Sequence, residues 1–153
     1  MKNKTFIEFG ELLLKIQAVD HKNNGLDFDQ AINQIIKLIS LRKKRSNKII
    51  IIGNGGSASI ASHIATDFLK NLRIPALAFN DASLLTCLSN DLGYEKVFSL
   101  PIGIIARKGD ILFAISSSGK SKNILNAVAE AKRKNCFVVT LSGFSPGNPL
   151  RRM

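Results

Sequence analysis

Four consecutive isoleucines followed at once by a glycine-rich turn constrain the fold more than any other feature of the sequence. The isoleucines occupy residues 49–52 and the turn, Gly-Asn-Gly-Gly, occupies 53–56. β-Branched side chains at this density predict a strand that is buried on both faces, as in a parallel sheet. Ser57 stands where a helix should begin, and a helix N-terminus presents unpaired N–H groups and a positive dipole end. The junction therefore predicts an anion site, and phosphate is the anion that we expect.

A second junction of the same kind follows later in the chain. A predicted strand at 111–115 runs into Ser-Ser-Ser-Gly-Lys-Ser, residues 116–121, and then into a predicted helix at 122–134. Alternating strands and helices predict an α/β fold with a parallel sheet. The other predicted elements are strands at 74–79 and 136–141, helices at 4–19, 27–45, 58–70 and 95–107, a short helix that opens at 80–83, and a polar break at 89–94. Every strand except the last is followed by a helix, so we expect the sequence to be cut short.

Length and composition predict one globular domain. The chain has 153 residues, of which 45% are hydrophobic, and this is enough for a core of its own. No apolar run approaches the roughly 20 residues that a membrane span needs, and acids interrupt the apolar part of the N-terminus, so no secretory signal is predicted. Cys87 and Cys136 lie among apolar residues without metal-ligand spacing, which favours free buried thiols in a reducing compartment. We therefore expect a cytoplasmic protein.

The net charge of +11 raises the question of nucleic-acid binding. The basic residues form short clusters, each at or just after the end of a predicted helix, where cations complement the helix dipole. Only one aromatic residue, Phe137, is close to such a cluster, so there is little sign of base stacking. The pattern favours solvated helix ends over a nucleic-acid partner.

Three interpretations of the two loops differ in their ligand. Residues 53–58 satisfy the dinucleotide pattern G-x-G-x-x-G/A, with Asp81 as the ribose-binding acid, but this leaves the serine-rich loop without a role. Residues 114–121 resemble a Walker A loop, but the following strand does not end in the acid that this site requires. The favoured interpretation lets both loops hold one phosphate monoester through helix N–H groups and four hydroxyls. These hydroxyls belong to Ser57, Ser116, Ser118 and Ser121.

His63 and Asp67 are four residues apart on the predicted helix 58–70 and therefore share one of its faces. From the spacing alone, an exposed ion pair is the favoured interpretation. The alternative is a two-ligand metal site or an acid–base pair, placed two turns beyond the first phosphate loop.

Three collinear segments carry a resemblance to a known family. Residues 53–68 (GNGGSASIASHIATDF), 89–98 (SNDLGYEKVF) and 109–143 resemble SIS (sugar isomerase) domains, and within them phosphoheptose isomerases. The resemblance implies a three-layer α/β/α sandwich around a parallel five-stranded sheet, with residues 47–153 as the SIS domain and residues 1–46 as a helical segment packed on it. It also implies a homo-oligomer, a tetramer or dimer, with sites at subunit interfaces.

The resemblance also assigns the site. It implies that the four serines bind phosphate, that Asn54, Asn90 and Asp91 line the sugar, that His63 binds zinc, and that Asp67 is both a zinc ligand and the acid–base group. Gly55, Gly56 and Ser117 complete the implied binding loops. Two departures matter: Asp67 is one methylene shorter than the family's glutamate, and the family draws a Gln and a second His from a last helix, whereas this chain has no His after His63. The zinc ligand set is thus incomplete in this sequence.

The implied activity is aldose–ketose isomerisation of sedoheptulose 7-phosphate, or a related sugar phosphate, for lipopolysaccharide or surface-glycan precursors. Two alternatives stay open. The first is a non-catalytic SIS module that senses a sugar phosphate or binds a protein partner. The second is an inactive, truncated isomerase. All three share a sugar-phosphate ligand and need neither a membrane nor a nucleic acid.

Overall fold

The computed structural model describes residues 4–153, which fall into two compact units. One unit extends to Leu41 and the other comprises Arg42–Met153. The first contains α1 (Lys4–Leu14), a short antiparallel hairpin of β1 (Ala18–Val19) and β2 (Gly25–Leu26), and most of α2 (Phe28–Lys43). Asp27 caps α2 as its sequence position suggests, because its Oδ1 accepts a hydrogen bond from the N–H of Gln30 at 2.8 Å. The predicted helix at 4–19 was too long, since residues 18–19 pair with β2 instead.

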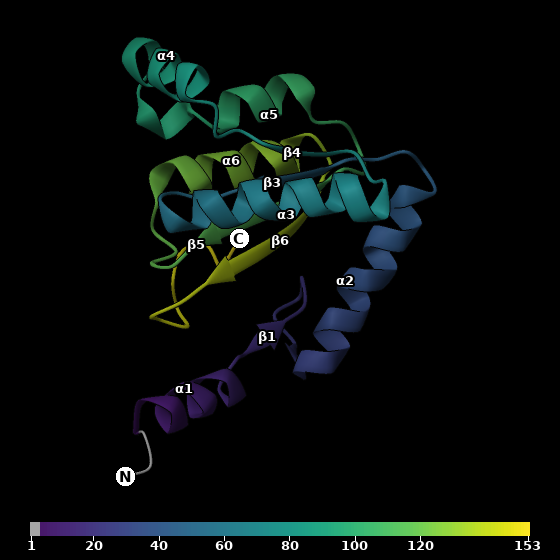
Figure 1. Cartoon of the computed structure of the whole chain (residues 1–153), viewed down its shortest axis with the longest axis vertical. Helices are drawn as coiled ribbons and strands as arrows, with labels where there is room; N and C mark the ends of the chain where they lie inside the picture. Colours follow the sequence, from purple (N-terminus) through teal and green to yellow (C-terminus); the bar gives the residue numbers. More distant parts are fainter. Residues whose placement is uncertain (1–3) are drawn as a thin grey trace. The chain divides into compact units, whose positions relative to one another are not determined.

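The second unit is built on a parallel sheet with the order β4-β3-β5-β6 (Figure 1). Its strands are β3 (Ile49–Ile52), β4 (Ala76–Ala78), β5 (Ile111–Ser116) and β6 (Phe137–Ser142). Ile52 is opposite Ala114 and Ser116 is opposite Ser142, so the C-terminal ends of these strands meet at one edge of the sheet. This confirms the predicted α/β fold with its parallel sheet. Residues 4–153 supply four strands to it, whereas the resemblance implies five.

The isoleucine run fills the middle of the sheet from both sides. All four side chains are at most 1% exposed, and burying each stabilises the fold by roughly 1.5–3 kcal/mol. Ile50 and Ile52 belong to the main hydrophobic cluster, which includes Phe98 and Ile102. Because successive side chains of a strand point to opposite faces, Ile49 and Ile51 serve the other face. A run without alternation is what a doubly covered central strand requires.

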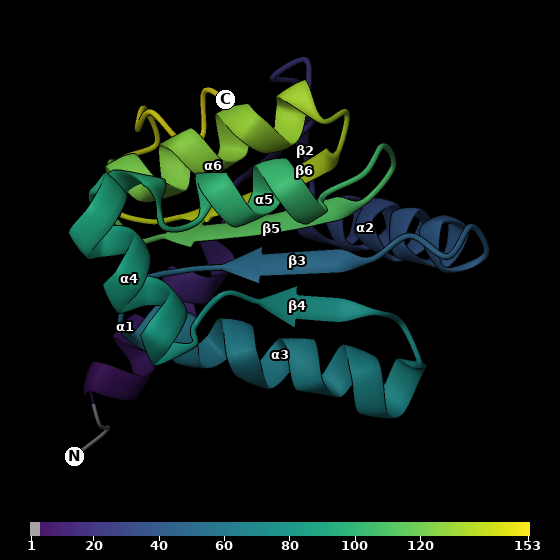
Figure 2. The same cartoon turned by 90° about the horizontal axis from the view of Figure 1, so that it is seen from above.

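Helices cover the sheet on both sides, which gives the expected α/β/α arrangement (Figure 2). On one face α3 (Gly56–Leu72) packs against β3 and β4, and its buried residues are the small Ala61 and Ala65. On the other face α6 (Lys122–Arg133) packs against β5 and β6, with α5 (Ser99–Ile105) beside it. α4 (Ala82–Leu92) begins at Asp81, whose carboxylate accepts from the N–H of Leu84 at 3.0 Å.

Two predicted boundaries were wrong. Residues 89–92, three of which are polar, continue α4, which ends at Leu92 and is capped by Gly93 with φ 90°. The single helix predicted at 95–107 is a 3₁₀ turn, η1 (Tyr94–Lys96), followed by α5. Pro101 is the third residue of α5, a position where its missing N–H is not needed for an intrahelical bond.

A buried carboxylate joins β3 to β5 at the edge of the sheet where the strands begin. Asp110, 1% exposed, pairs with Lys48 Nζ at 2.5 Å and accepts from the backbone N–H groups of Lys48 and Arg107 at 3.0 and 2.8 Å. Burial by itself would raise the pKa of this carboxyl, but the hydrogen bonds from Lys48, Arg107 and Asn47 outweigh it and hold the pKa below its ordinary value.

Both cysteines are free, but only one is partly buried. Burial raises the pKa of Cys136 to about 11, with a further contribution from the nearby Asp110 charge. Cys87 is exposed on α4, with its Sγ 3.6 Å from a carboxylate oxygen of Asp91, so its prediction as a buried thiol was wrong. An apolar sequence neighbourhood did not reveal which face of the helix the thiol occupies.

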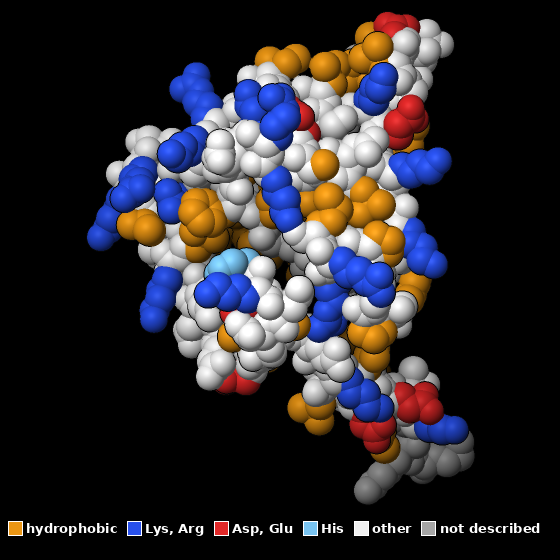
Figure 3. All heavy atoms as spheres, turned by 180° about the vertical axis from the view of Figure 1, so that it is seen from behind, with side chains coloured by type: hydrophobic (Ala, Val, Ile, Leu, Met, Phe, Trp, Pro, Cys, Tyr) orange, Lys and Arg blue, Asp and Glu red, His pale blue; other side chains and the backbone are white. Residues whose placement is uncertain are grey.

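The surface carries its positive charge in scattered positions. Lysine and arginine side chains are spread over the face shown in Figure 3, separated by neutral and hydrophobic groups. The guanidinium of Arg42 lies 4.2 Å from the centre of the Phe137 ring. The aromatic residue that adjoins a basic cluster therefore packs against this arginine. Among residues 4–153, no helix has the length and apolarity required to cross a membrane.

Candidate phosphate-binding site

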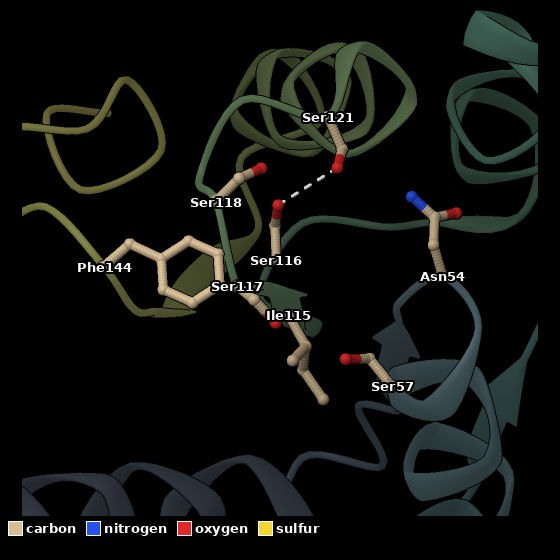
Figure 4. Close-up of a pocket in the computed structure, with 8 residues that line it drawn as sticks. All are labelled: Asn54, Ser57, Ile115, Ser116, Ser117, Ser118, Ser121 and Phe144. Carbon is tan, nitrogen blue, oxygen red and sulfur yellow. Dashed lines mark hydrogen bonds between the residues drawn. The ribbon is translucent and has the colours of Figure 1, made fainter.

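The two junctions that the sequence singles out form one pocket at the C-terminal edge of the sheet. β3 lies between β4 and β5, so the chain connects from β3 to one side of the sheet and then returns to the other side, which makes β3 a topological switch point. Open α/β sheets bind ligands at such switch points. The pocket has a volume of about 230 Å³. Eight residues line it: Asn54, Ser57, Ile115, Ser116, Ser117, Ser118, Ser121 and Phe144 (Figure 4).

Glycines shape the first wall of the pocket. A Cβ at Gly53 would lie 2.6 Å from Cβ of Ser57, so only glycine lets the end of β3 pass this close to the start of α3. Gly55 precedes α3 with φ 55° and ψ −124°, a conformation open to glycine and strained for other residues. The turn thus brings Ser57, in the first turn of α3, to face the serine-rich loop, as Figure 4 shows.

The second wall is the loop between β5 and α6. Ser116 is 5% exposed, and its hydroxyl donates to the hydroxyl of Ser121 at 3.1 Å (Figure 4). Ser121 is the N-cap residue of α6, yet its side chain makes no capping hydrogen bond, so its hydroxyl is directed to the pocket. Ser118 accepts from the N–H of Lys120 at 3.2 Å. These hydroxyls stand beside the N-terminus of a twelve-residue helix, which favours an anion.

A buried amide network fixes Asn54 at the junction of the two walls. Asn123, 3% exposed, donates to Oδ1 of Asn54 at 2.8 Å and accepts from Nδ2 of Asn54 at 3.1 Å. The hydroxyl of Tyr94 also donates to Oδ1 of Asn54, at 3.1 Å. The carbonyl oxygen of Asn54 therefore has both of its acceptor positions filled, and one N–H of its amide stays available to a ligand.

The segment after β6 braces the serine-rich loop from outside. The N–H of Gly143 donates to Ser117 O at 2.9 Å, and the N–H of Leu150 donates to Gly119 O at 3.0 Å. Gly119 has φ 63°, and a Cβ there would lie 1.9 Å from Oδ1 of Asn148, which is itself only 2% exposed. Asn148 thus fills the space that the missing side chain of Gly119 leaves.

The lining is chemically neutral and rich in donors. None of the eight lining residues, all from the described part of the chain, is charged or titrates between pH 5 and 8. Hydroxyls, one amide and the N–H groups of a helix N-terminus are what a phosphate monoester can accept hydrogen bonds from. The arrangement offers many donors around one small volume and no acid that would repel a dianion.

Not all sequence-predicted residues line this pocket. The predicted residues that line it are Asn54, Ser57 and the four serines of residues 116–121. The predicted residues that lie outside its lining are Gly55, Gly56, Asn90, Asp91, His63 and Asp67. Asn90 and Asp91 are exposed near the end of α4, where Nδ2 of Asn90 donates to Oδ1 of Asp91 at 2.8 Å. His63 and Asp67 form the expected i,i+4 pair on α3, with Nε2 and Oδ2 3.4 Å apart and side chains 80% and 49% exposed.

The described residues do not complete a zinc site. Catalytic zinc takes three protein ligands, and His63 with Asp67 offers two. In the part of the chain that the structure describes, no group of three His, Cys, Asp or Glu side chains could hold a metal ion. The pair therefore does not fit the metal by itself.

Sequence reasoning missed several residues that shape the pocket: Tyr94, Asn123, Phe144 and Asn148. Asn123 and Asn54 are 69 residues apart in sequence, so no local pattern links them. The loop Ser142–Leu150, rich in glycine and proline, was recognisable as a third polar junction after a strand, and this signal could have placed Phe144 at the same edge of the sheet.

Comparison with known proteins agrees with this description. A family model described as the SIS domain matches residues 26–143, and the chain belongs to this family. A phosphoheptose isomerase from Cytophaga hutchinsonii is 41% identical over 136 residues, which cover 84% of this chain and 71% of that protein.

Two solved phosphoheptose isomerases share the fold. The structure from Neisseria gonorrhoeae has 36% sequence identity and a TM-score of 0.70, covering 75% of this chain and 62% of that one. The structure from Francisella tularensis has 33% identity and a TM-score of 0.74, covering 80% and 65%. This chain thus spans less than two thirds of each of these two solved structures.

Proposed function

We propose that this chain binds a sugar phosphate in the serine-lined pocket and acts as an aldose–ketose isomerase of the phosphoheptose isomerase type. The observation that carries the proposal is the convergence of Asn54, Ser57 and the serines of residues 116–121 on one neutral, donor-rich pocket. The relatives named phosphoheptose isomerase support sedoheptulose 7-phosphate, or a closely related sugar phosphate, as the substrate. The product would enter lipopolysaccharide or surface-glycan precursors.

The phosphate pocket would act as an anchor rather than as the reaction centre. In the reaction a base removes the proton from one of the carbons C1 and C2 to give an enediol, and an acid returns a proton to the other. These carbons are at the end of the sugar opposite the 7-phosphate, so groups that act on them need not line the phosphate pocket. Binding energy from the phosphate then positions the reacting carbons.

We propose His63 and Asp67 as the acid–base pair for this proton transfer. Their 3.4 Å separation lets one orient the other, and both are accessible. Ser57 is near the start of α3, and each residue adds about 1.5 Å along a helix axis, so His63 lies about 9 Å and Asp67 about 15 Å beyond it. The pair and the phosphate pocket would thus contact opposite ends of one extended ligand.

We further propose that the chain assembles as a homo-oligomer. α1 has no buried residue, and its exposed apolar side chains include Phe6 and Leu14 at 74% and 88%. Apolar surface of this extent on a helix marks an interaction site. Size-exclusion chromatography with light scattering tests this: a multiple of 16.7 kDa is expected, and a monomer at micromolar concentration contradicts it.

The test of function separates binding from turnover. Calorimetry measures the affinity for sedoheptulose 7-phosphate, and NMR follows its conversion to heptose 7-phosphate, with and without added zinc. We expect binding and turnover, and we expect His63→Ala to abolish turnover while it leaves binding within about twofold, because the phosphate pocket is the anchor. The variant should also stay folded, since a pair this exposed contributes little to stability.

His21→Ala is the matched control, because His21 is the only other histidine and lies in the loop between β1 and β2. Absence of binding would refute the pocket assignment. Binding without turnover in the wild-type chain would refute the isomerase assignment and favour a non-catalytic SIS module.

A further inference from the structure

One lining residue of the pocket is unlike the others. Phe144 is an aromatic side chain beside serines, and it is 88% exposed. Its φ is 59°, a left-handed conformation that is strained for a residue with a Cβ. Among the described non-glycine residues with positive φ, it is the only aromatic one. An exposed ring held in a strained backbone has an energetic cost that its packing within the chain does not explain.

The segment that carries Phe144 is firmly held. Gly143 is bonded to Ser117, Leu150 is bonded to Gly119 and fully buried, and Asn148 fills the space above Gly119. Side-chain bonds from Asn148 to Ser142 and to Ser145 O, at 2.9 and 2.7 Å, close the segment on itself. Phe144 is therefore the projecting residue of a segment that is anchored at both of its ends.

The ring lies at the exposed margin of the pocket. Figure 4 places Phe144 across the serine-rich loop from Asn54 and Ser57, with its ring beside Ser117. The hydrogen-bond donors gather around Ser116 and Ser121, where the phosphate is expected. A pocket of about 230 Å³ takes the phosphate and the carbons next to it, so the remainder of the ligand must leave past one of the walls.

We propose that the Phe144 ring contacts the carbon skeleton of the sugar next to its phosphate and thereby selects sugar phosphates over inorganic phosphate. Sugars present C–H groups as well as hydroxyls, and an aromatic face packs against such apolar patches with little loss of side-chain entropy. Hydroxyls and N–H groups recognise the phosphate, and Phe144 recognises what is attached to it. This inference rests on the proposed function, because it concerns the same pocket.

The test compares two ligands across a short set of variants. Calorimetry gives the dissociation constants of inorganic phosphate and of sedoheptulose 7-phosphate. We expect Phe144→Ala to weaken sedoheptulose 7-phosphate by roughly fivefold to tenfold, as expected for one lost aromatic contact, and to leave inorganic phosphate within twofold.

Phe144→Gly separates the ring from the backbone. Glycine adopts φ 59° without strain, so the loop keeps its conformation while the ring is removed. We expect Phe144→Gly to match Phe144→Ala, and Phe144→Tyr to bind like the wild type. The control is Ile104→Ala, which removes an apolar side chain that is 73% exposed on α5 and outside the pocket lining.

Each outcome has one meaning. Equal weakening of both ligands by Phe144→Ala and Phe144→Gly, or no weakening of either, would overturn the role of the ring. Equal affinity of the wild-type chain for the two ligands would also overturn it, while the phosphate pocket would stand. If the wild-type chain bound neither ligand, the proposed function would fail and the role of Phe144 with it.

Discussion

Asn54 and Asn123 exchange two side-chain hydrogen bonds, at 2.8 and 3.1 Å, between the turn after β3 and the first turn of α6. The exchange joins the two walls of the pocket through residues 69 positions apart. It also determines the orientation of the Asn54 amide, because Oδ1 is occupied by Asn123 and Tyr94 and the free N–H must point elsewhere. Asn123 does not line the pocket and is a positioning residue.

We expect Asn123→Ala to weaken inorganic phosphate binding by roughly threefold to tenfold, which corresponds to about one hydrogen bond. The free Asn54 amide would rotate and its N–H would no longer be held toward the ligand. Calorimetry measures the change, and Asn126→Ala is the matched control because Asn126 is exposed on the same helix and its side chain donates to Glu95 O, away from Asn54. Unchanged affinity in a folded Asn123→Ala variant would contradict the role of the amide network.

Ser116→Ala should weaken phosphate binding more strongly, by roughly tenfold to a hundredfold, since hydrogen bonds to a charged group are worth about 1.5–3 kcal/mol. The hydroxyl of Ser116 is nearly buried and is already oriented toward Ser121. Ser59→Ala serves as the control, because Ser59 is exposed on α3 and does not line the pocket. Equal affinities of the two variants would place the phosphate elsewhere.

Gly119 and Asn148 should be coupled in stability. Gly119→Ala would place a Cβ 1.9 Å from Asn148 Oδ1 at φ 63°, and we expect a loss of roughly 2–4 kcal/mol in the free energy of unfolding. In an Asn148→Gly background the clash is absent and the same substitution should cost about 1 kcal/mol, the backbone contribution alone. Urea unfolding of the four proteins forms a double-mutant cycle, and additive effects would show that the two positions do not interact.

The Asp110 pair should make stability depend on pH in the acid range. Its pKa is lower in the folded chain than the ordinary value of 3.8, so its stabilisation is present above that value and is lost as the pH falls through the folded pKa. We expect Asp110→Asn to cost roughly 2 kcal/mol near pH 7, and the difference from wild type to shrink below about pH 4. Urea unfolding as a function of pH measures it, with the exposed Asp29→Asn as control. A difference independent of pH would exclude a charge effect.

Much of the fold was predictable because its signals are local. The unbroken isoleucines predicted a strand covered on both faces. Asp27 and Asp81 indicated where helices begin, and both cap a helix in the structure. The two small polar loops predicted the edge of the sheet at which the pocket lies. An error arose where polar side chains predicted a break: residues 89–92 stay in α4, because the helix is terminated by the positive φ of Gly93 and not by the first polar residues.

The parts of the site that could not be predicted depend on distant residues. Ser116 and Ser121 are five positions apart, so the sequence alone could link them. Asn123 bonds to Asn54 only because the folded chain brings them together. The same holds for Asn148 and Gly119. Phe144 has no pattern of its own, because a single aromatic in a turn usually signifies nothing. Its position at the pocket follows from the bonds that fix Gly143 and Leu150.

Because the lining of the pocket is neutral, the pH dependence of phosphate binding should come from the ligand and not from the protein. A phosphate monoester loses its second proton at about pH 6. Serine hydroxyls, amides and backbone N–H groups do not change their protonation state in that range. The affinity should therefore change with pH as the phosphate group of the ligand titrates. A chemist who designs an inhibitor for this pocket would adjust the acidity of the phosphate surrogate, for example a fluorinated phosphonate, rather than look for a protein group to engage.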